Sequence, residues 1–157
     1  MSIKIISTEE EKKVFYTGVH KVASVIASTL GASGRTVAIS QGYRTDPFVT
    51  KDGVTVSRNL ITLKDEVENV GAMFVYQAAR KTVDAAGDGT TTTAVLLSSI
   101  LAEGNKVISS GAKPQFVKQG IELAVKTVVD DLKKNSEVIG DDNDKILNVA
   151  TISANND

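Results

Sequence analysis

The sequence contains no cysteine and no tryptophan, and aromatic residues make up only 4% of its 157 positions. Without cysteine the chain can form neither disulfides nor thiolate metal sites. The scarcity of aromatic rings argues against the stacking platforms that hold single-stranded nucleic acid. The hydrophobic core must therefore be built from valine, isoleucine, leucine and alanine, a composition that favours closely packed helices.

The chain also has almost no net charge and no long apolar run. The formal net charge is −1, so the chain has no general electrostatic attraction to nucleic acid or to an anionic membrane. No uninterrupted apolar run reaches membrane-spanning length, and residues 1–6 lack the apolar segment of a secretory signal. From these absences we expect a cytoplasmic protein with no nucleic-acid or membrane partner. The length alone predicts a single core.

Apolar periodicity predicts a mainly helical fold with a small β-hairpin. Apolar residues recur at helical spacing along most of the chain, and Thr8-Glu-Glu-Glu11 has the pattern of a capping box. Short alternating or turn-bounded segments predict strands. The predicted helices cover residues 8–29, 64–86, 90–109, 114–132 and 145–149, the hairpin strands cover 36–40 and 48–50, and Ser2–Ile6 is a predicted edge strand.

The most informative segment is Asp84-Ala-Ala-Gly-Asp-Gly-Thr-Thr-Thr-Thr93, which separates two predicted helices. Its glycines let backbone N–H groups approach a ligand closely, and the free N–H groups of a helix start bind phosphate. Four consecutive β-branched residues are poor helix formers, so we expect their hydroxyls to contact a ligand. Asp88 would repel phosphate unless a divalent cation lay between them, and Mg²⁺ prefers oxygen ligands. The segment therefore predicts a nucleotide–Mg²⁺ site, although it is not a Walker A loop.

Two further glycine-containing turns, Thr29–Arg35 and Lys51–Gly53, also have simpler explanations, because glycine often ends helices and Asp-Gly often turns a chain. Asp52 and Asp88 can act together, one holding Mg²⁺ and the other orienting or deprotonating an attacking water. Alternatively, both are helix caps or turn residues. Arg35 and Lys51 are candidate phosphate ligands, although such residues are more often solvated surface cations.

Five motifs occur in an order that is similar to the N-terminal part of the GroEL-type (group I) chaperonin subunit. The element at Gly87–Thr92 is highly specific, and the one at residues 151–155 is a good second anchor. The resemblance covers nearly the whole chain. The motifs are Thr29-Leu-Gly31 with Gly34-Arg35, Lys51-Asp-Gly-Val54, Asn69-Val-Gly-Ala72, Ala85-Ala-Gly-Asp-Gly-Thr-Thr-Thr92 and Thr151-Ile-Ser-Ala-Asn155.

The resemblance implies a multihelical equatorial-domain fragment that binds ATP, Mg²⁺ and K⁺. It implies that Asp88 coordinates Mg²⁺ and that Asp52 positions the attacking water as a catalytic residue. It also implies that K⁺ faces the backbone oxygens of Thr29 and Lys51, together with Thr91. The nucleotide-binding residues that it implies are Thr29, Leu30, Gly31, Lys51, Gly53, Gly89, Thr90, Thr91, Thr92, Ile152 and Ser153.

The same resemblance implies a division of the chain and a set of partners. Residues 1–135 correspond to the first half of the equatorial domain, and residues 136–157 to the start of a truncated intermediate domain. The family forms homo-oligomeric rings that use ATP hydrolysis to fold non-native polypeptides, in some cases with a co-chaperonin. We expect the isolated chain to lack ATPase activity, because the family's principal catalytic aspartate lies beyond it.

The chain also departs from the family's usual pattern. Ala32-Ser33 stands where the family usually has Pro-Lys, and the loss of proline removes a restraint on that loop. Two other functions remain open from the sequence. One is a non-catalytic assembly or regulatory fragment that associates with full-length chaperonin subunits, and the other is a small-molecule kinase or phosphatase that converged on a Gly-Asp-Gly-Thr turn.

Overall fold

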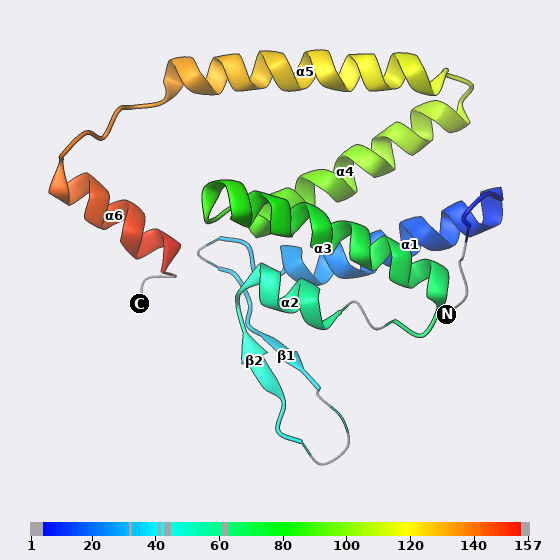
Figure 1. Ribbon diagram of the computed structural model, residues 1–157, viewed down its shortest axis with the longest axis horizontal. Helices are drawn as coiled ribbons and strands as arrows, with labels where there is room; N and C mark the ends of the chain where they lie inside the picture. The colour runs from blue at the N-terminus through cyan, green and yellow to red at the C-terminus, as the bar shows by residue number, and fades with distance from the viewer. Residues whose placement is uncertain (1–4, 32, 41, 43–44, 61–62, 155–157) are drawn as a thin grey trace. The chain divides into compact units, whose positions relative to one another are not determined.

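A computed structural model describes residues 5–154, apart from 32, 41, 43–44 and 61–62. As predicted, the described chain is mainly helical and has a small hairpin (Figure 1). It divides into two compact units, residues 1–105 and residues 106–157, with the boundary inside the fourth helix. The elements are α1 (Glu9–Ala27), β1 (Val37–Ile39), β2 (Phe48–Thr50), α2 (Gly53–Asn59), α3 (Glu66–Ala86), α4 (Thr90–Ser109), α5 (Pro114–Asn135) and α6 (Asn143–Ser153).

The start of α1 is fixed by the predicted capping box. The Glu11 backbone N–H donates to Thr8 Oγ1 at 3.1 Å, and the Thr8 N–H donates to Glu11 Oε2 at 3.1 Å, which satisfies two donors that the helix leaves free. One turn along, Lys12 Nζ donates to Glu9 Oε1 at 2.6 Å. This hydrogen bond lowers the pKa of the Glu9 carboxyl and raises the pKa of Lys12.

The predicted hairpin is present as a two-stranded antiparallel sheet. Val37 is opposite Thr50 and Ile39 is opposite Phe48. The predicted N-terminal edge strand falls mostly outside the described residues. Its last two residues, Ile5 and Ile6, are described and lie in irregular structure before α1.

The core of the first unit forms where α1 packs along α3 (Figure 1). Two glycines bring the helix backbones together: a Cβ on Gly71 would lie 2.3 Å from the Phe15 carbonyl oxygen, and one on Gly18 would lie 2.0 Å from the Glu68 carbonyl oxygen. Small residues are needed at such a contact, because any side chain would force the helices apart. The buried apolar cluster consists of Val19, Val22, Ile26, Val56, Ala72, Val75 and Ala94.

The second unit is formed by the end of α4 with α5 and α6. Pro114 is the first residue of α5, where its missing N–H costs no hydrogen bond. The Asp142 carboxylate caps α6 by accepting from the N–H groups of Asp144 and Lys145. No helix in the described part of the chain is long and apolar enough to cross a membrane.

Candidate nucleotide-binding site

The turn between α3 and α4 is built on two glycines in the left-handed region. Gly87 ends α3 with φ 77° and donates its N–H to the Val83 carbonyl oxygen at 2.8 Å. Gly89 has φ 91°, and its N–H donates to Asp88 Oδ1 at 2.6 Å. Residues that carry a side chain rarely adopt such φ values, so both positions favour glycine. Between them the turn leaves the Asp88 side chain exposed.

The four threonines that open α4 do not share one role. The Thr93 hydroxyl lies 2.9 Å from the Gly89 carbonyl oxygen and 2.9 Å from Thr82 Oγ1, so it ties the start of α4 to α3. Thr90, Thr91 and Thr92 form no hydrogen bond through their hydroxyls to any residue that the structure describes. Three of the four hydroxyls therefore keep their hydrogen-bonding capacity for a ligand or solvent.

Gly53 brings a second predicted motif to the start of α4. A Cβ on this buried glycine would lie 2.9 Å from Thr91 Oγ1 and 3.0 Å from Thr90 Oγ1. The same Cβ would lie 3.2 Å from Ile26 Cγ2, near the end of α1. Gly53 thus joins the end of α1, the start of α2 and the start of α4. A glycine is needed here because only a bare backbone fits between the two hydroxyls.

The Asp52 carboxylate has a local structural role. Its Oδ2 accepts from the Thr55 N–H at 2.8 Å and also from the Thr55 hydroxyl, and the Asp52 N–H donates to Thr50 Oγ1 at 3.0 Å. Asp52 therefore stabilises the first turn of α2, which is the capping alternative left open by the sequence. The side chain is nevertheless exposed, so a second role toward a bound water stays a prediction.

The loop after α1 folds back on itself. The Arg35 N–H donates to the Ser28 carbonyl oxygen at 2.7 Å, and the Gly34 N–H donates to the Gly31 carbonyl oxygen at 2.9 Å. Gly34 lies directly against Thr29, since a Cβ there would be 2.2 Å from the Thr29 carbonyl oxygen. Thr29 begins this loop three residues after Ile26, whose carbonyl oxygen accepts from the Thr29 hydroxyl at 2.7 Å. Ile26 thereby connects the loop to Gly53.

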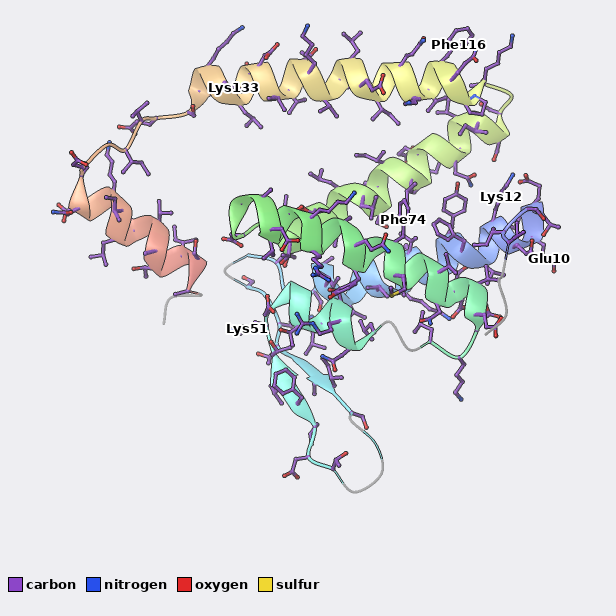
Figure 2. All side chains as sticks on the ribbon, in the orientation of Figure 1. Glu10, Lys12, Lys51, Phe74, Phe116 and Lys133 are labelled. Atoms are coloured by element: carbon purple, nitrogen blue, oxygen red, sulfur yellow. The ribbon has the colours of Figure 1, made fainter. Side chains whose placement is uncertain are left out.

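The remaining predicted residues lie at exposed positions. Lys51 lies between β2 and α2 (Figure 2), and Leu30 and Gly31 are exposed on the loop after α1. Ile152 and Ser153 belong to the second unit, where both are exposed in the last turn of α6. Ala32, one of the two departures from the family pattern, lies outside the described residues.

Sequence reasoning missed two residues of the site. Ile26 gives no sign in the sequence that it contacts Gly53, because apolar periodicity places it in the core without naming its neighbours. Thr82 was likewise treated as an ordinary helical residue, although its hydroxyl is bonded to Thr93. Both contacts join segments that only tertiary packing brings together.

The chemistry of the site suits a metal ion that is shared with a ligand. In the described part of the chain, no group of three or more histidine, cysteine, aspartate or glutamate side chains is placed to hold a metal. Mg²⁺ does not need such a group, because it commonly binds through one or two carboxylates, several waters and substrate phosphates. Asp88, exposed in the turn directly before α4, is a carboxylate of this kind.

Comparison with known proteins gives the class to which the chain belongs. Residues 22–157 match the model of the TCP-1/cpn60 chaperonin family, so the chain belongs to that family. Among solved structures, it is similar to the chaperonin gp146 from the bacteriophage EL 2 (Pseudomonas aeruginosa), with a TM-score of 0.76 and 27% identity. The match covers 97% of this chain and 26% of that chain, so this sequence spans about a quarter of its relative's length.

These comparisons confirm the predicted resemblance to a chaperonin subunit, without distinguishing group I from group II, and the predicted mainly helical chaperonin fold. They also make an unrelated kinase or phosphatase a poor explanation of the Gly-Asp-Gly-Thr turn, because the match extends far beyond that turn. The gp146 structure was determined in the presence of ATP-BeFx.

Proposed function

We propose that this chain supplies the phosphate and Mg²⁺ side of the ATP site in a ring chaperonin that assists the folding of non-native polypeptides. The observation that carries the proposal is the meeting of Gly53 with the Thr90 and Thr91 hydroxyls. Through this contact, two motifs that are nearly forty residues apart in the sequence meet next to the turn that carries the exposed Asp88. The use of ATP-BeFx with the related gp146 supports nucleotide as the ligand.

Under this proposal the start of α4 contacts the phosphates. Thr90, Thr91 and Thr92 have hydroxyls that are not used within the described chain, and the helix start adds backbone N–H groups and a positive dipole end. Gly53 and Gly89 keep the backbone free of side chains where the phosphates approach. Asp88 would hold Mg²⁺, which offsets the charge of the phosphates when it is bound.

The other predicted residues complete the proposed site. Asp52 would orient the attacking water while its Oδ2 continues to cap α2. The backbone oxygens of Thr29 and Lys51, with Thr91, would face K⁺. Leu30 and Gly31 would line the nucleotide. For Ile152 and Ser153, which belong to the second unit, a place on the adenine side rests on the sequence resemblance alone. The division into an equatorial part up to residue 135 and an intermediate part from residue 136 belongs to the same proposal.

Nucleotide binding tests the proposal better than turnover does, because this chain covers only 26% of gp146. We expect isothermal titration of the 157-residue protein with ATP to show weak binding that requires Mg²⁺. Asp88→Asn should reduce the Mg²⁺-dependent affinity by about tenfold or more, a loss of about 1.4 kcal/mol.

A matched control is available four residues upstream. Asp84 is also an exposed aspartate, and its carboxylate lies 3.8 Å from Arg80 Nε on the surface of α3. Asp84→Asn removes the same charge and should leave the Mg²⁺-dependent affinity unchanged. Equal losses in the two variants would mean that the effect is general electrostatics, and an unchanged affinity in Asp88→Asn would remove Asp88 from the site.

The exposed apolar side chains of α5 and α6 favour a second candidate function. In this candidate the chain acts as an assembly or regulatory module that binds full-length chaperonin subunits, because exposed apolar surface promotes association. Size-exclusion chromatography with and without a full-length chaperonin would show such a complex as a shift in elution. The side chains concerned are Phe116, Ile121, Leu123, Val125, Val128, Val129, Leu132, Ile146, Leu147, Val149 and Ile152.

A further inference from the structure

The chain contains two Asp-Gly pairs, and the structure places them in contrasting environments. Asp88 and Gly89 lie in the turn between α3 and α4, where Asp88 is exposed. Asp52 and Gly53 lie at the start of α2, where Gly53 is the buried first residue of the helix. Asp-Gly is the sequence in which aspartate can most readily cyclise, because glycine has no side chain to hinder its backbone nitrogen.

In the Asp88-Gly89 pair one oxygen of the carboxylate already contacts the backbone nitrogen. The Gly89 nitrogen lies 2.6 Å from Asp88 Oδ1 and donates its hydrogen bond to that oxygen. Within the described residues this N–H has no backbone acceptor, so no helical hydrogen bond has to break before the nitrogen approaches the carboxyl carbon. Gly89 also lies outside α4, whose first residue is Thr90.

In the Asp52-Gly53 pair the corresponding groups are restrained. Asp52 Oδ2 accepts from both the N–H and the hydroxyl of Thr55, which holds the carboxylate over the first turn of α2. Gly53 is enclosed by Ile26, Thr90 and Thr91, with less than van der Waals room for even a single added carbon. Cyclisation at Asp52 therefore requires local opening of α2, which has a free-energy cost.

From this contrast we propose that Asp88-Gly89 is a site of spontaneous aspartate isomerisation in the folded protein, and that Asp52-Gly53 is protected. The Gly89 nitrogen forms a bond to the Asp88 carboxyl carbon and loses its proton. One carboxyl oxygen leaves as water, taking that proton and one from solvent, and a succinimide results. Water then adds to the main-chain carbonyl carbon of residue 88 and breaks its bond to the Gly89 nitrogen, which gives isoaspartate with no net change in mass.

The consequence for the site is geometric and holds whatever ligand the turn binds. In isoaspartate the main chain runs through the former side-chain carboxyl carbon, and the free carboxylate is attached directly to the α carbon. The backbone thus gains one methylene between two positions that need φ near 77° and 91°. The modification therefore lengthens the turn and changes the position of its carboxylate.

The test is peptide mapping of the 157-residue protein after prolonged incubation at 37 °C in buffer. Isoaspartate is quantified at the two Asp-Gly pairs by chromatographic separation of equal-mass peptides and by fragmentation that distinguishes the two linkages. We expect isoaspartate to form at Asp88 about tenfold faster than at Asp52, a rate ratio that corresponds to about 1.4 kcal/mol of activation free energy. The two pairs are compared in one sample, so differences in folding between variants do not enter.

A parallel incubation in denaturant separates the effect of structure from that of sequence. Once the chain is unfolded, the two pairs should react at similar rates. Asp88→Glu, which lengthens the side chain and disfavours the five-membered ring, should remove the product at residue 88 and leave Asp52 as before. Equal rates at the two pairs in the folded protein, or protection of both relative to the unfolded chain, would overturn the proposal.

Discussion

The close contact between α1 and α3 predicts that a larger residue at Gly71 destabilises the protein. Replacement of Gly71 by alanine adds a single carbon in α3, and that carbon would lie 2.3 Å from the Phe15 carbonyl oxygen and 2.8 Å from the Val19 nitrogen. Ordinary van der Waals contact of a Cβ begins at about 3.4 Å. The two helices must therefore separate by about 1 Å, because neither contacted atom belongs to a flexible side chain.

The expected loss of stability follows from two opposing terms. Alanine is favoured over glycine inside a helix by about 1 kcal/mol, which stabilises the variant. Overpacking in a close-packed core costs about 1–3 kcal/mol, and separation of α1 from α3 also loosens the contacts of the fully buried Ala72 and Val75. We expect Gly71→Ala to lower the free energy of unfolding by about 1–2 kcal/mol.

Gly104→Ala is the matched control. Gly104 also lies inside a helix of the first unit, but a Cβ there would meet no atom within 4 Å. Only the helix-propensity term acts, so this variant should be more stable than the parent by about 0.5–1 kcal/mol. Urea unfolding followed by far-UV circular dichroism gives both values, with the slope of the transition as a check that the unfolded states are comparable. If the two substitutions change stability in the same direction, the close backbone contact is not as described.

Three further predictions concern single interactions in the first unit. Thr93→Val removes the hydroxyl that links Thr82 to the Gly89 carbonyl oxygen and should cost about 1 kcal/mol in urea unfolding; Thr92→Val, at an exposed position, is its control and should cost less. Thr8→Ala removes the capping box of α1 and should lower the free energy of unfolding by about 0.5–2 kcal/mol. The helical ellipticity should fall as well. An unchanged unfolding transition would mean that the first turn of α1 already frays in the parent protein. Glu68→Gln breaks the ion pair with Lys21 Nζ, which lies 2.6 Å and 2.7 Å from the two carboxylate oxygens. Because Lys21 is half exposed, the loss of unfolding free energy should be at most about 1 kcal/mol and should shrink as salt is added. A loss that does not depend on salt would indicate lost packing instead.

Secondary structure could be predicted from the sequence where local chemistry decides it. Three helix ends depend only on residues a few positions away. They are the capping box of Thr8 and Glu11, the αL glycine at position 87, and Pro114 at the start of α5. Apolar periodicity added the lengths of the helices. The last helix is longer than predicted at both ends, Asn143–Ser153 in place of residues 145–149. Its earlier start follows from the Asp142 cap, which precedes the first apolar residue of the helix.

The candidate site could be predicted only in part. The Asp88 turn was recognisable because two glycines around an aspartate, followed by four consecutive threonines, are poor choices for helix stability. Its relation to Gly53 was not, because nothing local indicates that these residues meet. The roles of the threonines were also indistinguishable in the sequence, because their contacts, such as that of Thr93 with Thr82, arise from packing against other segments.

The sequence by itself determined the approximate positions of α1, α3, α4, α5 and α6 and singled out the Asp88 turn as the candidate site, since these depend on residues adjacent along the chain; α2 was not among the predicted helices. Only the tertiary structure decided that Gly53 fits between the hydroxyls of Thr90 and Thr91 against Ile26, and that the Thr93 hydroxyl contacts Thr82 of α3. The physical reason is that these relations depend on how closely α1, α2, α3 and the start of α4 pack, and glycines at the crossing set that distance.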